Sequence, residues 1–191
     1  RDIVAVAVLW VILTIAGVAL VISFVSFPHA ASEEAEVVDD AFVLLTVLAV
    51  PVFTFVLVAL LYSGVRFRRK GRPAADGPPI RSHGLSVAVW LLITTALTIT
   101  VIIHPGITGL NELRAKDREP ADLVLHVEAR QWAWKVTYLE QNVFSRREMV
   151  LPLGAHTRFN VTALDDDVLH SFWIPAFRIK IDAVPGLITS T

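Results

Sequence analysis

The stretch that decides the fold of the last third of the chain is DVLHSFWIP, residues 167–175, which is followed by KIDAVPG, residues 180–186. A lone histidine after an acid, such as His170 after Asp167, is most often a surface residue or a hydrogen-bonded core residue. A second run, QWAW at residues 131–134, lies upstream. Its tryptophans are two residues apart and share one face if the strand is regular. By themselves these residues are typical of core or membrane-interface aromatics.

The segments around both runs have the alternation expected of β-strands. Apolar and polar side chains alternate in residues 122–128 and again in residues 158–163. Residues 152–154, Pro-Leu-Gly, form a turn signal between two such segments. Short alternating segments with polar turns predict a β-sandwich or a small barrel for the region after residue 111.

The composition indicates a membrane protein. Hydrophobic residues make up 54% of the 191 residues, and the mean hydropathy is +0.61. Such a chain is too apolar for an ordinary soluble domain. The net charge of −1 implies no nucleic-acid partner. The 191 residues contain no cysteine, which excludes disulfides, zinc fingers and iron–sulfur clusters within them.

Three charge-free runs predict transmembrane helices at about residues 3–27, 41–65 and 85–103. Each is long enough to cross an apolar core of ~30 Å as a helix. Pro51 removes a helical hydrogen bond near the middle of the second run and predicts a kink. A cleaved signal peptide is the alternative for the first run, since the small residues 30–32 follow it. The run is longer than an ordinary signal core of about 7–15 residues, which favours a retained helix.

The two connecting loops differ in charge, and this predicts the topology. Residues 28–40 carry five acids and no Lys or Arg, whereas residues 66–83 carry six basic residues and one acid. The positive-inside rule places the basic loop in the cytoplasm. We therefore expect a transmembrane region at residues 1–104 and an extracytoplasmic domain at residues 105–191. A nucleic-acid site is a poor alternative for the basic loop, because two spans flank it.

Taken together, the runs at residues 131–134, 167–175 and 180–186 resemble cytochrome c oxidase subunit II. The resemblance covers nearly the whole chain from Ala41 to Thr191 and is carried by specific motifs. It implies a membrane-anchored α plus β protein, with three transmembrane helices followed by a partial cupredoxin-like Greek-key β domain. The first helix is not part of the commonest two-helix pattern of that family.

In the resembling family His170 matches the first ligand of the dinuclear copper centre CuA. A loop that carries two cysteines, a second histidine and a methionine follows the turn that Pro185 and Gly186 match. Imidazole and thiolate suit copper sites for electron transfer. Because no cysteine is present, we expect CuA to be completed by residues absent from this sequence, and the chain to continue beyond Thr191.

The resemblance also assigns roles to other residues. Trp132 and Trp134 match the aromatic stretch where electrons from cytochrome c enter, although Ala133 replaces an aromatic residue common in relatives. The run Asp165, Asp166 and Asp167 matches carboxylates that help to dock cytochrome c; otherwise such a run is a solvated turn. The positions of Lys180 and Asp182 match a pair at the interface with the catalytic subunit; otherwise they are an ordinary surface ion pair.

The third apolar run departs from the family pattern. Many relatives carry a glutamate three residues before its tryptophan, at the mouth of a proton path, but here Val87 precedes Trp90. His83 lies one helical turn earlier and titrates near neutral pH. It is either a substitute proton-path entrance or an interfacial histidine without that role.

The resemblance implies an electron-transfer subunit of a respiratory haem-copper oxidase in a prokaryotic plasma membrane. Electrons would pass from cytochrome c, or a similar donor, through CuA to haem in catalytic subunit I, which also holds CuB. No catalysis is expected on this chain alone. The alternatives are subunit II of a quinol oxidase lacking CuA, a membrane-tethered copper-binding cupredoxin, and a CuA-bearing nitric oxide reductase.

Overall fold

The computed structural model describes residues 1–68, 71 and 83–191, which form two compact units. The first unit comprises Arg1–Phe27 and Asp39–Gly109, and the second comprises Pro28–Val38 and Leu110–Thr191. Most of the basic loop predicted at residues 66–83 lies outside the described residues, namely 69–70 and 72–82.

Within the described part of the chain, three helices are long and apolar enough to span a membrane. Helix α1 is Asp2–Phe24, α2 is Glu33–Arg66, and α3 is Gly84–Val101. A π-helical segment, η1, follows at Ile102–Ile107, where His104 leaves helical φ/ψ. Helix α4 is Thr108–Asp117. Charge-free runs form these helices because a helix satisfies every backbone group internally.

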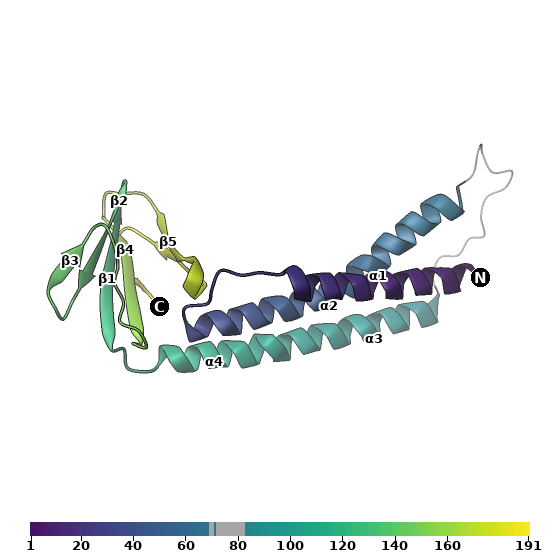
Figure 1. Cartoon of the computed structure of the whole chain (residues 1–191), viewed down its shortest axis with the longest axis horizontal. Helices are drawn as coiled ribbons and strands as arrows, with labels where there is room; N and C mark the ends of the chain where they lie inside the picture. Colours follow the sequence, from purple (N-terminus) through teal and green to yellow (C-terminus); the bar gives the residue numbers. More distant parts are fainter. Residues whose placement is uncertain (69–70, 72–82) are drawn as a thin grey trace. The chain divides into compact units, whose positions relative to one another are not determined.

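Helices α1 and α2 are joined by polar contacts within the first unit (Figure 1). The indole Nε1 of Trp10 donates to the carbonyl of Pro51 at 2.8 Å. The hydroxyls of Thr14 and Thr54 are 2.7 Å apart. Trp10 and Thr14 are four residues apart and therefore lie on one face of α1. Such contacts are the usual means of holding helices together where the surroundings are apolar.

Close packing and an ion pair add to this interface. A Cβ built on Gly17 would lie 2.8 Å from Val50 Cγ1, so a larger residue would force Val50 to shift. At the amino end of α1, Asp2 Oδ1 accepts hydrogen bonds from the Tyr62 hydroxyl at 2.8 Å and from Arg66 Nε at 3.2 Å. These contacts show how α1 packs against α2.

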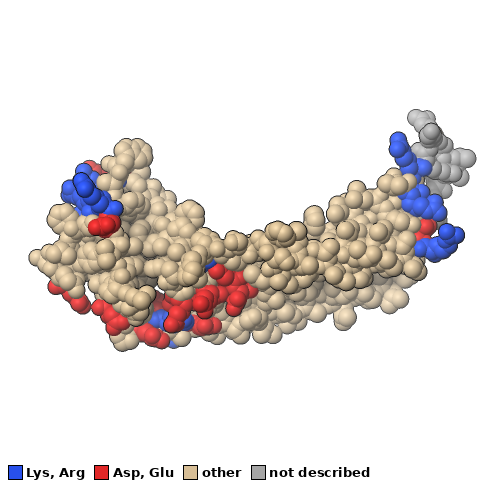
Figure 2. All heavy atoms as spheres, viewed as in Figure 1, with Lys and Arg blue, Asp and Glu red and all other residues tan. Residues whose placement is uncertain are grey.

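Helix α2 has a charged turn at each end and a proline between them. Its first turn carries Glu33, Glu34 and Glu36, and its last carries Arg66. Figure 2 shows the corresponding acidic and basic groups of side chains. The Ser32 hydroxyl accepts the N–H of Ala35 at 3.2 Å and so caps the start. Figure 1 shows α2 as a bent helix, as expected from a proline that removes one backbone hydrogen bond.

The second unit contains a mixed five-stranded sheet and a two-stranded sheet. The larger sheet has the order β3-β2-β1-β4-β7. Strands β1 and β4 are parallel, and every other pair of neighbouring strands in this sheet is antiparallel. The smaller sheet pairs β5 with β6. The strand bounds are β1 Leu123–Arg130, β2 Ala133–Tyr138, β3 Val143–Ser145, β4 Thr157–Ala163, β5 His170–Ile174, β6 Ile179–Ala183 and β7 Thr189–Ser190.

The core of this unit follows the alternation predicted from the sequence. Every second side chain is buried from Leu123 in β1 and from Phe159 in β4, and the Phe159 and Phe172 rings lie 5.6 Å apart between the two sheets. Residues 152–154 form a turn, with Gly154 at φ +76°, a conformation that favours glycine. The expected order, three long apolar helices followed by a β domain, is confirmed.

Residues 28–38 belong to the sheet-containing unit, although they precede most of α2 in the chain. The N–H of Ala31 donates to the carbonyl of Ala176 at 2.9 Å. Arg178 Nη2 donates to the carbonyl of Pro28 at 2.8 Å, and Lys116 of α4 pairs with Glu33. The short 3₁₀ turn Pro175–Phe177 and its neighbour Arg178 therefore hold this segment.

The sequence did not predict α4, which continues the helical chain beyond residue 104. Its residues TGLNELRAKD include good helix formers but few apolar side chains. An apolar periodicity is the main signal of a helix, and it is missing here. Basic residues in the last turn, Arg114 and Lys116, favour this helix through its dipole.

Candidate functional site

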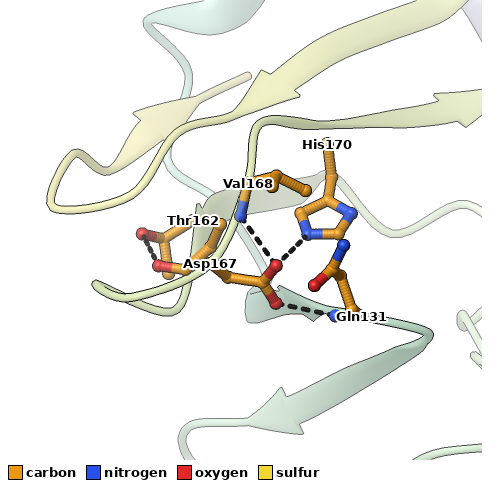
Figure 3. A network of polar contacts seen from close by, with 6 residues as sticks. Gln131, Thr162, Asp167, Val168 and His170 are labelled. Atoms are coloured by element: carbon orange, nitrogen blue, oxygen red, sulfur yellow. Dashed lines mark hydrogen bonds and ion pairs between the residues drawn. The ribbon is translucent and has the colours of Figure 1, made fainter.

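His170 begins β5, and its imidazole lies inside the domain. It pairs with Ala183 of β6, and its side chain is 16% exposed. The Nε2 atom is buried and 3.3 Å from Asp167 Oδ1. The approach is not aligned for a hydrogen bond, so within the described residues Nε2 has no hydrogen-bond partner. The close contact still places a carboxylate next to one ring nitrogen (Figure 3).

The Asp167 carboxylate connects the loop before His170 with the turn after β1. Its side chain is 8% exposed. Oδ1 accepts the N–H of Val168 at 2.7 Å, and Oδ2 accepts the N–H of Gln131 at 2.7 Å (Figure 3). The Val168 N–H lowers the pKa of this carboxyl most; burial opposes the effect, and Gln131 and His170 lower the pKa further. The net lowering keeps Asp167 ionised at neutral pH.

The two tryptophans of residues 131–134 have different surroundings. Trp132 lies in the turn between β1 and β2 and is 90% exposed. Trp134 lies on β2 and is half-buried, with its ring 6.1 Å from the His170 ring and 5.7 Å from that of Phe172. The expectation that both share one face of a regular strand is wrong, because β2 begins at Ala133.

The predicted acidic run divides between two environments. Asp165 and Asp166 are exposed in the loop between β4 and β5. The carboxylate of Asp167 is turned inward toward Gln131 and Val168 instead. Two of the three carboxylates predicted to dock cytochrome c therefore face solvent.

Lys180 and Asp182 lie on β6, two residues apart, and both are exposed. Lys180 Nζ lies 5.8 Å from the centre of the Trp173 ring on β5, which is a cation–π contact. The residue pairs Trp173–Lys180 and Ser171–Asp182 are opposite each other in the β5–β6 register. The predicted pair is thus part of one solvent-facing surface of the smaller sheet.

His83 is the N-cap of α3 and precedes its first helical turn. Its Nδ1 atom accepts the N–H of Ser86 at 3.3 Å, and the Ser86 hydroxyl lies 3.1 Å away. The same face of the helix carries Val87 one turn later. Nδ1 is therefore the acceptor that caps the start of α3.

Sequence reasoning missed two features of this region. The first is the bond between Gln131 and Asp167, which are 36 residues apart. The second is a groove beside Trp132 that Arg146, Arg147 and Met149 help to line. The only available signals were two adjacent arginines and the single methionine of the sequence.

The donor set for copper is one imidazole. The described residues contain no cluster of three or more His, Cys, Asp or Glu side chains arranged to hold a metal, and the sequence has no thiolate. A metal-binding histidine turns its other ring nitrogen toward an orienting carboxylate, so with Asp167 beside Nε2 the copper ligand would be Nδ1. These residues therefore fit one ligand position of a copper centre.

Known proteins match both parts of the chain. Residues 142–191 match the family model described as cytochrome c oxidase subunit II, periplasmic domain. The chain is 26% identical to cytochrome c oxidase subunit 2 of Thermostichus vulcanus, over 85% of this chain and 64% of that protein. It is 27% identical to cytochrome c oxidase subunit 2 of a Synechocystis species, over 83% of this chain and 60% of that protein. The chain thus spans less than two thirds of these relatives.

A solved structure is also similar in sequence. It is the periplasmic domain of subunit II of cytochrome oxidase (CoxB) of Bradyrhizobium japonicum, with 31% identity and a TM-score of 0.36. The match covers 38% of this chain and 63% of that chain. The family model and the named relatives support the assignment of this chain as a cytochrome c oxidase subunit II.

Proposed function

We propose that this chain is the electron-transfer subunit of a haem-copper oxidase in a prokaryotic plasma membrane. The contrast between the acidic 28–40 loop and the basic 66–83 loop supports a cytoplasmic amino end and an extracytoplasmic sheet domain. Electrons from cytochrome c, or a similar donor, arrive at Trp132. They pass through a copper centre at His170 to haem in catalytic subunit I.

The observation that carries this proposal is the short connection between an exposed indole and the buried imidazole. Trp132 is 90% exposed, and its neighbour Gln131 is bonded through its N–H to Asp167. The other oxygen of Asp167 lies 3.3 Å from His170 Nε2. The half-buried ring of Trp134, on the five-stranded sheet, lies beside His170 on the two-stranded sheet. Only Gln131 and the Asp167 carboxylate therefore lie between a partner that touches Trp132 and the proposed ligand His170.

His170 would hold one copper of a CuA pair, with the thiolates supplied from outside these 191 residues. Copper bound by thiolate and imidazole changes charge with little rearrangement of its ligands. Asp167 orients the imidazole and keeps its charge because two backbone N–H groups donate to it. Trp134 packs beside the ring and Phe172 packs against Trp134, which helps to exclude water and to fix the direction of the imidazole.

The remaining predicted residues are assigned by their surroundings. Asp165 and Asp166 face solvent beside the loop that holds Gln131 and attract a basic face of cytochrome c. The surface of Lys180, Asp182 and Trp173 meets the catalytic subunit. His83 is proposed as the cytoplasmic entrance of a proton path; a role limited to capping α3 is the alternative.

Two other functions remain as alternatives. A quinol oxidase subunit II without CuA has no use for a ligand histidine, so the Asp167–His170 arrangement disfavours it. A tethered copper carrier needs one anchor, whereas three helices here are long and apolar enough to span a membrane. The test is the visible and electron-paramagnetic spectrum of the purified full-length protein. A thiolate–copper signal that is lost in His170→Ala supports the proposal, and no copper signal in the native complex supports the quinol-oxidase alternative.

A further inference from the structure

A groove of about 380 Å³ lies beside Trp132 on the sheet domain. Its apolar floor is made by Trp134, Met149 and Phe172, which come from β2, the loop after β3, and β5. Arg146 and Arg147 line its edge from the loop after β3. The groove therefore combines an apolar surface with two cations, directly beside the exposed indole.

The two arginines are available to a partner. Both are exposed, and in the described residues neither guanidinium forms an ion pair with a carboxylate. Arg146 lies over the Phe144 ring at 5.5 Å, which limits its motion. The hydroxyl of Ser145 accepts the N–H groups of Arg147 and Glu148, each at 3.3 Å, and so shapes this loop. One carboxylate, Glu148, lines the groove against these two positive charges.

Nearby charges do not cancel this basic edge. Lys135 Nζ also lies over the Phe144 ring, 5.8 Å from its centre, and its charge is matched by Glu128 at 4.0 Å. Asp165 and Asp166 belong to the loop that Asp167 connects to Gln131. Figure 2 shows basic side chains gathered on the sheet domain near the end of β1. Trp132 thus borders a groove that carries Arg146 and Arg147. The acidic pair Asp165 and Asp166 lies in the loop that is bonded to its neighbour Gln131.

We infer that this groove receives the carboxylate of an acidic side chain from the docking face of the electron-donor protein. The inference rests on the proposed function and names the chemistry of its partner. Guanidinium groups bind carboxylates through paired hydrogen bonds. The apolar floor accepts the apolar surface around a redox centre, and the arginines speed the encounter by attraction.

The first experiment uses two small oxidants of opposite charge on the reduced, copper-loaded full-length protein. The probes are hexacyanoferrate(III) and tris(phenanthroline)cobalt(III). In the double variant Arg146→Gln/Arg147→Gln, oxidation by the anion should slow about tenfold at low ionic strength. Oxidation by the cation should accelerate, and both effects should fade near 1 M salt, where the screening length is ~3 Å.

The matched control is Arg114→Gln/Arg118→Gln, which removes two charges from the same unit. These residues lie before the start of β1, and Trp132 follows its end, about 26 Å away at ~3.3 Å per residue over eight residues. The control should change either rate by less than about twofold, because charges beyond a screening length of ~10 Å contribute little. Equal slowing in both double variants would overturn the inference, since net charge alone would explain it.

The second experiment replaces the small ions with an acidic and a basic c-type cytochrome. Arg146→Gln/Arg147→Gln should slow association of the acidic cytochrome, and Asp165→Asn/Asp166→Asn should slow that of the basic one. If only hexacyanoferrate(III) responds to the arginines, the groove attracts small anions and the docking inference is overturned. A protein without a copper signal overturns the proposed function and this inference together. Copper-loaded protein that is indifferent to Arg146 and Arg147 overturns the inference alone.

Discussion

The carboxylate of Asp167 accepts the backbone N–H of Gln131 at 2.7 Å, so the loop before His170 is bonded to the turn that carries Trp132. The same carboxylate has its other oxygen 3.3 Å from the His170 imidazole. One side chain therefore positions both the exposed indole and the proposed ligand. Its neighbours Asp165 and Asp166 are exposed to solvent, unlike Asp167.

The substitution Asp167→Asn should weaken copper binding by about 10–100-fold, as expected for the loss of an orienting partner. An amide has one acceptor oxygen and an NH₂ group, so it cannot accept both N–H groups. The measurement is copper affinity of the full-length protein, together with its thiolate–copper absorption. Asp166→Asn, which removes the same charge from the exposed neighbour, is the control. Equal affinities in the two variants would contradict a positioning role.

The lowered pKa of Asp167 predicts a contribution to stability that depends on pH. The group's folded pKa lies below its ordinary value of 3.8. Its contribution is therefore complete above that value and is lost as the pH falls through the lower folded pKa. Denaturant unfolding of copper-free protein, followed by tryptophan fluorescence, should show an acid-dependent loss that is smaller in Asp167→Asn. Identical pH profiles for the two proteins would rule out this contribution.

Trp132→Ala should slow electron transfer from a cytochrome far more than it changes binding. The indole is the exposed group nearest the Gln131–Asp167–His170 connection. We expect at least about a tenfold slower rate, which corresponds to about 1.4 kcal/mol in the barrier. Trp132→Phe should recover part of the loss because it keeps an aromatic contact. Stopped-flow reduction of the copper absorption measures the rate, and an unchanged rate with an intact spectrum would refute the assignment.

Phe159→Ala should destabilise the sheet domain by about 3–5 kcal/mol, the usual cost of removing a buried aromatic side chain. Phe159 is 2% exposed and packs against Phe172 between the two sheets. Leu153→Ala is the control, because Leu153 is fully exposed in the turn before β4. Its effect should stay within about 0.5 kcal/mol. Denaturant midpoints of the two variants provide the comparison.

The proposed topology predicts different labelling on the two sides of the membrane. In Glu119→Cys the new thiol should react with a membrane-impermeant maleimide on intact cells. In Arg68→Cys it should react only after permeabilisation. The unsubstituted protein gives the background. Labelling of Arg68→Cys in intact cells would reverse the orientation derived from the loop charges.

The helices were predictable because their signal is local. A run of 25 residues without charge, such as residues 41–65, has few structural alternatives in an apolar solvent. The faces of β1 and β4 were predictable for a similar reason, since alternation identifies the buried side of a strand. Alternation does not identify the partner strand, however, and the parallel pairing of Val127 with Val161 required the structure.

The site was predictable only in part. The resemblance singled out His170 and Trp132, whose roles stay predictions, and it treated Asp167 as one of three equivalent docking carboxylates. Its inward position depends on an N–H group 36 residues away, which no local pattern reports. The turn position of Trp132 was missed for a related reason, because spacing of two residues implies a shared face only inside a strand.

The contacts of residues 28–38 bear on how the sheet domain can be produced by itself. This segment leaves the ribosome before any of the strands, so the domain must complete its folding around a peptide that was synthesised earlier. A soluble recombinant fragment that starts after α3 would lack the backbone groups that Ala176 and Arg178 contact. Joining residues 28–38 to such a fragment through a flexible linker would restore these backbone contacts. The domain could then be studied without detergent.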